Sequence, residues 1–188
     1  ICCAAILPLA LTTQSPPQVS KAPRLRPMLA VTRSPLAAAG VIVAALSSAS
    51  FRMVGPVYGA EVGLSADQIA TFLAAFVLGG ALAQYPIGWL ADRYDRRWVL
   101  IWLSAVAIAS CALTMALQSS GTTMIMINAA LFGLITFPIY SVAASHAHDF
   151  AASDERVELS AALMFFYALG AIIAPLPASV LIAQFGPG

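Results

Sequence analysis

The sequence predicts an all-α fold, a multi-pass bundle of transmembrane helices. Of its 188 residues, 61% are hydrophobic and only 9% are charged, whereas soluble domains carry about 25% charged residues. Apolar stretches of about 20 residues, the length that crosses a hydrocarbon layer of roughly 30 Å, recur along the chain. A soluble core has no room for that much apolar surface, so the stretches are predicted to span a membrane.

The chain begins with an apolar run and continues into a polar segment. Residues 1–12 hold a run about half as long as a spanning helix, and we expect the tail of a truncated transmembrane helix there. A signal peptide is the alternative, but no basic region precedes the apolar residues. Residues 13–34 are rich in proline and arginine and too polar to lie in lipid. They are predicted to form a flexible linker stiffened by its prolines.

Five full spans are predicted after the linker, in an incomplete bundle over residues 35–188. Each is a long apolar run bounded by polar residues, with ends uncertain by about 2–4 residues. The spacing of Ser65 and Gln68 predicts a capping box at the start of the second span. Small residues recur every four positions, as around Gly79 and Gly133, which favours closely packed helix backbones, and rocking helices need such seams too. The spans are Pro35–Tyr58, Asp67–Leu90, Trp98–Gln118, Thr122–Ser145 and Glu158–Gln184.

Basic residues fall on alternate connections of the predicted bundle. They precede the first span, join the second span to the third, and join the fourth to the fifth, whereas the other two connections contain none. Because basic residues stay on the cytoplasmic side, the linker and these connections are predicted to be cytoplasmic. We expect a multi-pass protein of the plasma membrane, in a bacterium the inner membrane. The residues are Lys21, Arg24, Arg26, Arg33, Arg93, Arg96, Arg97 and Arg156.

The turn between the second and third spans reads GWLADRYDRR over Gly88–Arg97. At the end of its helix, Asp92 can accept hydrogen bonds from Arg96 one turn on, or from the exposed N–H groups that begin a neighbouring helix. Such contacts exist in only one arrangement of two half-bundles. The turn is therefore predicted to act in a conformational switch.

This turn resembles the cytoplasmic loop signature of the major facilitator superfamily, G-x-L-A-D-R-x-G-R-R, with Asp95 in place of the second glycine. Aspartate tolerates turn geometry better than most residues. The resemblance implies a secondary transporter that works by alternating access, needs no cofactor, and uses the turn to latch its cytoplasmic side. Setting the topology is the alternative role for each arginine. The gating candidates are Gly88, Asp92, Arg93, Arg96 and Arg97.

The family's twelve-helix plan carries this signature after helix 2 and again after helix 8. A helix tail, a basic proline-rich linker and then a span resemble the join between the two halves, so the five spans would be helices 7 to 11. The chain is then a fragment of the C-terminal half, and its partners are the N-terminal half, the lipid bilayer and a small solute. No carboxylate lies in the centre of a predicted span, so a coupling proton would need an acid in the other half.

A few polar or amphipathic side chains lie within the predicted spans. Such residues usually face the interior of a bundle, where they bond another helix or line a solute pathway. Arg52 lies about 26 Å from Pro35 along its helix, so its side chain either reaches water beyond the hydrocarbon layer or belongs to the pathway. The pathway candidates are Arg52, Gln84, Tyr85, Asn128, Thr136 and Tyr140.

Other function classes find little support. A net charge of +1 without a basic cluster gives no reason to expect nucleic acid. His146, His148 and Asp149 form a cluster at the end of the fourth span, but histidines two residues apart diverge on a helix, so we expect solvated loop histidines and no metal site. No enzyme motif is present, so no catalytic residue is assigned.

Two alternatives to a transporter remain. A transporter-like protein that senses or scaffolds without moving solute would have the same sequence features. A rhodopsin-like receptor fragment is suggested by the triplet Asp92-Arg93-Tyr94, but the next span begins almost at once at Trp98 and no N-P-x-x-Y follows.

Overall fold

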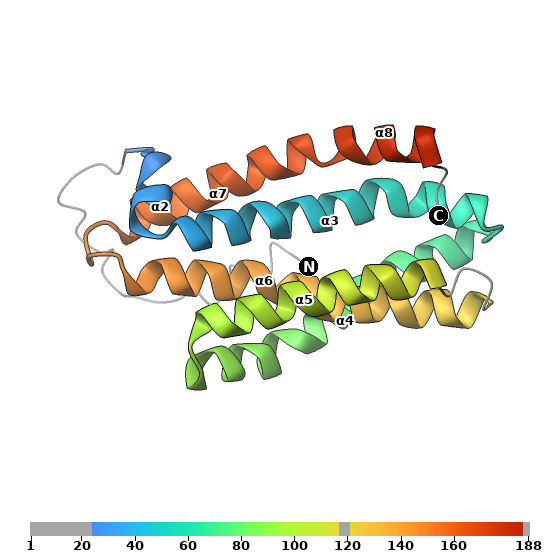
Figure 1. Ribbon diagram of the computed structural model, residues 1–188, viewed down its shortest axis with the longest axis horizontal. Coiled ribbons are helices and arrows are strands. Elements are labelled where there is room, and N and C mark those ends of the chain that lie inside the picture. Colours follow the sequence, from blue (N-terminus) through green and yellow to red (C-terminus); the bar gives the residue numbers. More distant parts are fainter. Residues whose placement is uncertain (1–23, 117–120, 186–188) are drawn as a thin grey trace, which may run out of the picture.

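The computed structural model describes residues 24–116 and 121–185. Within them, five helical stretches are long and apolar enough to cross a membrane, which confirms the predicted multi-pass all-α fold. They run along one common axis (Figure 1). The predicted helix tail at residues 1–12 and most of the linker lie outside the described residues. The helices are α2 (Met28–Arg33), α3 (Pro35–Glu61), α4 (Ala66–Arg93), α5 (Arg96–Ala116), α6 (Thr122–Asp149), α7 (Arg156–Ile173) and α8 (Pro175–Phe185).

Two elements differ from the prediction. The last part of the expected flexible linker is helix α2, which follows Pro27 and consists largely of good helix formers, MLAVTR. The last span, expected as one helix, is divided after Ile173, and α8 begins at Pro175. Proline has no N–H to continue the hydrogen-bond ladder, so the ladder is interrupted at Pro175, although the backbone of Ala174 stays helical and the two helices form one candidate span. The predicted capping box at Ser65 and Gln68 is confirmed.

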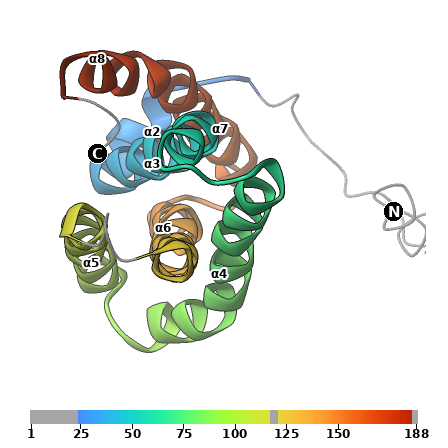
Figure 2. The same cartoon turned by 90° about the vertical axis from the view of Figure 1, so that its right-hand side faces the viewer.

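Helix α6 lies at the centre of the bundle. It packs against α3, α4 and α5, while α7 and α8 pack mainly on α3. Seen along the axis, α6 lies between α4 and α5, with α3 and α7 above it (Figure 2). The end of α6 is therefore within reach of the turn that joins α4 to α5.

The middle of α4 and α6 is joined almost backbone to backbone. A Cβ atom at Gly79 would overlap the backbone carbonyl group of Ala130, and one at Gly133 would overlap that of Phe76. The predicted close packing of small residues is therefore present at this crossing. Beside it, the rings of Phe51 and Phe76 stack with their centroids 4.0 Å apart, which ties α3 to the same seam.

The outward surface of the bundle is apolar. Leu82 on α4, Ile108 on α5 and Ile172 on α7 are 74%, 72% and 71% exposed. Large apolar side chains that face outward from several helices are unfavourable in water. They are the normal covering of helices in a hydrocarbon layer, as the membrane-spanning prediction requires.

The predicted basic segments lie at one end of the bundle, here called the basic end. This end contains α2, the turn from α4 to α5 and the connection from α6 to α7, on the left in Figure 1. At the opposite end, the connection between α3 and α4 contains no lysine or arginine. The basic segments therefore share one side, and the assignment of that side to the cytoplasm stays a prediction.

Candidate functional site

The turn from α4 to α5 is very short. Only Tyr94 and Asp95 lie between the end of α4 and the start of α5. The Asp95 carboxylate accepts a hydrogen bond from the backbone N–H of Arg97 at 2.9 Å, as a helix N-cap residue does. Among the described residues only glycines have positive φ angles. Asp95 therefore needs no left-handed backbone here, and its side chain caps α5.

Arg96 connects three helices at the basic end. Its Nη2 atom donates to Asp92 Oδ1 at 3.2 Å, and its Nη1 atom pairs with the Asp149 carboxylate. The same Nη1 atom also donates to the carbonyl oxygen of Ser145 at 3.4 Å. The predicted contact between Asp92 and Arg96 is thus present, and Asp149 joins it from α6. We call Asp92, Arg96 and Asp149 the clasp.

Each charge of the clasp lies at the unfavourable end of its own helix. Asp92 and Asp149 are in the last turns of α4 and α6, where the helix dipole is negative, and Arg96 is in the first turn of α5, where it is positive. The Arg96 side chain is 22% exposed and the Asp92 side chain is 74% exposed. Each carboxylate therefore depends on Arg96, and Arg96 on the two carboxylates, to offset the unfavourable dipole of its own helix.

A small pocket with both polar and apolar walls lies at the clasp, between α4 and α6. Its volume is about 140 Å³. In its wall, Gln84 Oε1 accepts a hydrogen bond from Ser141 Oγ at 3.0 Å. This bond is a second link between α4 and α6, further from the basic end than the clasp. A Cβ atom at Gly88 would meet no atom within 4 Å. The lining residues are Gln84, Gly88, Ala91, Asp92, Arg96, Pro138, Ser141, Val142 and Ser145.

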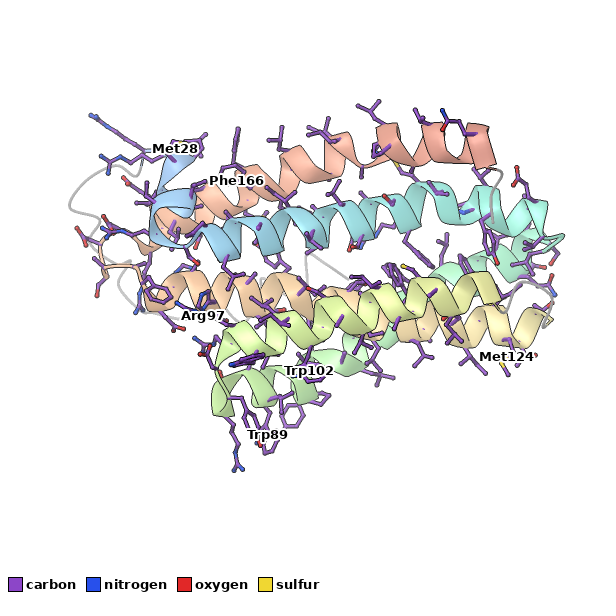
Figure 3. The ribbon with its side chains drawn as sticks, in the orientation of Figure 1. Met28, Trp89, Arg97, Trp102, Met124 and Phe166 are labelled. Atoms are coloured by element: carbon purple, nitrogen blue, oxygen red, sulfur yellow. The ribbon has the colours of Figure 1, made fainter. Side chains whose placement is uncertain are left out.

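Arg93 and Arg97 lie outside the clasp. The Arg93 guanidinium carbon is 4.5 Å from the centroid of the Trp89 ring, and Arg97 is exposed. Neither forms an ion pair within the part of the chain that the structure describes. Figure 3 shows Arg97 at the basic end, with Trp89 on the outer side of the bundle. The predicted gating set therefore separates into a connected pair, Asp92 and Arg96, two outer arginines, and Gly88, which lines the pocket.

The sequence model of the Major Facilitator Superfamily matches residues 37–187. The chain belongs to the Major Facilitator Superfamily. The predicted resemblance is therefore confirmed, and family membership does not support the alternative of a receptor fragment.

Proteins similar to this Major Facilitator Superfamily chain are named as uncharacterised transporters of the same type. One from Enterobacter sp. (strain 638) is 28% identical over 184 residues, which cover 97% of this chain and 47% of that protein. One from Yersinia pestis (strain Pestoides F) is 29% identical over 160 residues, 85% of this chain and 40% of that protein. The chain thus spans less than half the length of these relatives. No solved structure matches it.

Three of the predicted pathway residues lie on the surface of the bundle, namely Arg52, Gln84 and Tyr85. Gln84 is brought to the pocket beside the clasp. Tyr85 is 84% exposed on α4, and Arg52 is exposed on α3. The structure does not bring Arg52 or Tyr85 to the pocket that Gln84 lines.

The other three pathway candidates lie along α6 and have polar contacts within the bundle. Thr136 is fully buried and donates to the carbonyl oxygen of Phe132 at 2.8 Å. Asn128 accepts a hydrogen bond from Ser110 Oγ at 3.4 Å, and the Tyr140 hydroxyl lies 3.1 Å from the Met164 sulfur. The contacts of Asn128 and Tyr140 join α6 to other helices, whereas that of Thr136 lies within α6. A role in a solute pathway stays a prediction. The described contact partners are Ser110 on α5, Phe132 on α6 and Met164 on α7.

The prediction of solvated loop histidines is wrong. Helix α6 continues one turn beyond its predicted end, so His146 and His148 are helical. His146 is 5% exposed, with its ring edge-on to Phe150 at 5.1 Å, and His148 Nε2 lies 3.2 Å from Ser160 Oγ on α7. No cluster of ligands in the described ranges could hold a metal ion.

Asp149 is the member of the clasp that the sequence did not predict. In the sequence it forms a cluster with His146 and His148, after a span that ends on the same side as the arginine-rich turn. An acid at that position is the signal that could have identified a partner for the turn.

Proposed function

We propose that this chain is part of a secondary transporter that moves a small solute across a membrane by alternating access. Membership of the superfamily, five candidate spans and a charged turn at one end support this function. We further propose that the chain belongs to the C-terminal half, with the basic end in the cytoplasm of a bacterium and the linker preceding α3. The basic, proline-rich composition of residues 13–34 supports this assignment.

The observation that carries the mechanism is the position of Arg96 between two carboxylates. Asp149 and Arg96 hold one another within the bundle, while the Asp92 side chain is 74% exposed. In our proposal Arg96 fixes the direction of Asp92, and the exposed carboxylate accepts hydrogen bonds from a helix start in the other half. Rocking of the halves breaks this contact, so the clasp favours the arrangement that is closed at the basic end.

The solute pathway is proposed to lie between this half and the N-terminal half. The described spans offer no carboxylate at their centres, so a coupling proton would be carried by an acid of the other half. This half would then supply the clasp and one wall of the pathway.

The test is Asp92→Asn in the full-length protein, reconstituted in vesicles. A cysteine at Ser145, which lines the pocket beside the clasp, reports opening through its reaction with a membrane-impermeant maleimide. We expect faster labelling in the variant, because the neutral amide accepts hydrogen bonds more weakly than the carboxylate. Asp67→Asn is the matched control, since Asp67 lies in the first turn of the same helix, at the opposite end.

Counterflow assays with a panel of labelled solutes test transport separately. Counterflow of any solute supports transport, whereas conformational change without counterflow of any of them would favour a sensor or scaffold. Labelling rates and counterflow that are both unchanged by Asp92→Asn would refute the gating role.

A further inference from the structure

Helix α2 runs across the ends of the spans rather than along them (Figure 1). It comprises Met28–Arg33, and Ala30 is its buried residue, fully enclosed against the bundle. The helix packs against α3 and α7. It is therefore fixed at the basic end, in the orientation of a helix that lies in a membrane plane.

The outer side of this segment is apolar. Leu25, Met28 and Val31 are 60%, 66% and 36% exposed. Met28 and Val31 are three apart and lie on one face of α2, and Leu25 precedes the helix. Figure 3 shows Met28 at the outer edge of the basic end. An apolar face with arginines beside it is typical of helices that lie at a membrane surface.

Two ion pairs hold this segment against the start of α7. Glu158 accepts hydrogen bonds from the backbone N–H of Arg24 at 3.1 Å and from Arg26 Nη1 at 3.4 Å. Arg33 Nη2 pairs with a Glu155 oxygen at 2.7 Å. We call the pairs Arg26–Glu158 and Arg33–Glu155 the tether. Because the tether fixes how the segment lies on the bundle, it also fixes the direction of the apolar face.

Exposed tryptophans mark the membrane surface at the same end. Trp89, Trp98 and Trp102 are 49%, 62% and 67% exposed near the turn from α4 to α5. Tryptophan collects at the boundary between hydrocarbon and water, at the level of the lipid headgroups. Since α2 and this turn lie at the same end of the bundle (Figure 1), the apolar face of α2 is in reach of the headgroup layer.

We propose that α2 and the residues before it bind acidic phospholipid headgroups as an interfacial helix. Leu25, Met28 and Val31 enter the apolar boundary of the leaflet, while the guanidinium groups of Arg24 and Arg26 lie at the lipid phosphates. The Arg26 side chain remains 63% exposed although it is paired with Glu158, so it is accessible to a phosphate. This inference depends on membrane insertion and not on the proposed transport function.

The test places a spin label at Met28→Cys in the full-length protein, in a background without other cysteines. The protein is reconstituted in phosphatidylcholine alone or mixed with phosphatidylglycerol. In the mixed bilayers the label is expected to collide with lipid-soluble oxygen more than with a water-soluble nickel complex. Ser153→Cys, an exposed position in the α6–α7 connection at the same end, is the matched control and should show the opposite preference.

Arg24→Gln tests the role of charge without breaking the tether, because Arg24 bonds to Glu158 through its backbone N–H. One arginine near an acidic surface contributes enough to change the ratio of lipid-bound to unbound segment by roughly fivefold. The shift is expected in the mixed bilayers and absent in phosphatidylcholine alone.

Three results would overturn the proposal: a water-exposed label at Met28 in both bilayers, a label shielded from both reagents by protein, or no dependence on lipid charge. Loss of solute counterflow with an unchanged label depth would contradict only the transport proposal.

Discussion

The clasp and the tether lie at the same end of the bundle, but their charges are arranged oppositely. In the clasp, Asp92 and Asp149 are at helix C-termini, where the dipole disfavours a carboxylate. In the tether, Glu155 and Glu158 are at the start of α7, where the dipole favours one. The clasp groups therefore require one another, whereas the tether carboxylates are stabilised even without their arginines. We infer that the clasp is the more sensitive of the two to substitution.

The largest effect is expected for Arg96→Gln. The substitution leaves two carboxylates facing each other at helix C-termini without the cation between them. Solvent-exposed ion pairs contribute roughly 0.2–1 kcal/mol each, and Arg96 forms two of them, so we expect the inward/outward distribution to shift by roughly fivefold. The measurement is maleimide labelling of a cysteine at Ser145 in the reconstituted full-length protein. Arg96→Lys should be intermediate, since an ammonium group cannot bridge two carboxylates as a guanidinium fork does.

Arg97→Gln is the matched control for this comparison. Arg97 is the next residue along α5, loses the same charge, and is exposed. Equal effects of the two substitutions would mean that the general charge of the turn matters, and the special position of Arg96 would be disproved.

The sequence was sufficient to predict the elements that depend on local composition. Apolar runs of membrane length gave the spans, because lipid imposes a fixed length on them. The capping box at Ser65 was predictable because its partner Gln68 is three residues away. The small-residue spacing around Gly79 predicted a close contact between helix backbones, but not that the partner would be Ala130 on α6.

The elements that the sequence did not predict depend on where helices end and how they are rotated. Asp149 reaches Arg96 only because α6 continues one turn further than expected. That extra turn also buries His146. Helix α2 was missed because its six residues are too few to show a period and its orientation is set by ion pairs with α7. Each of these contacts joins segments far apart in the chain.

A smaller effect is expected when the tether is weakened by acid. The hydrogen bond from Arg33, together with its charge, outweighs desolvation and lowers the pKa of the Glu155 carboxyl below its ordinary value. A carboxyl with a lowered folded-state pKa contributes stability above its unfolded pKa and loses it as the pH falls through the folded value. Docking of α2 should therefore be constant near neutral pH and loosen only below the ordinary range of glutamate. The mobility of a spin label at Thr32→Cys measures it.

Glu155→Gln separates this effect from other titrating groups. The variant should have a more mobile label at neutral pH and lose the acid transition that Glu155 causes. A transition that persists unchanged in the variant, or that lies at or above the ordinary pKa of glutamate, would contradict the role of the Arg33–Glu155 pair. Maleimide labelling of a cysteine at Ser145 should be unchanged in Glu155→Gln, because the clasp and the tether are separate sets of ion pairs.

The smallest effect is expected for Arg93→Gln, which lies in the same turn as the clasp but outside it. Its contact with the Trp89 ring is exposed, and such cation–π contacts contribute about 0.5–1 kcal/mol. We expect thermal unfolding in detergent to shift slightly and labelling at Ser145 to change by less than roughly twofold, because no clasp group loses its partner. Trp89→Leu should have a similar small effect on unfolding. If Arg93→Gln changed labelling as much as Arg96→Gln, the clasp would have to include Arg93, and the position between two carboxylates would not be what distinguishes Arg96.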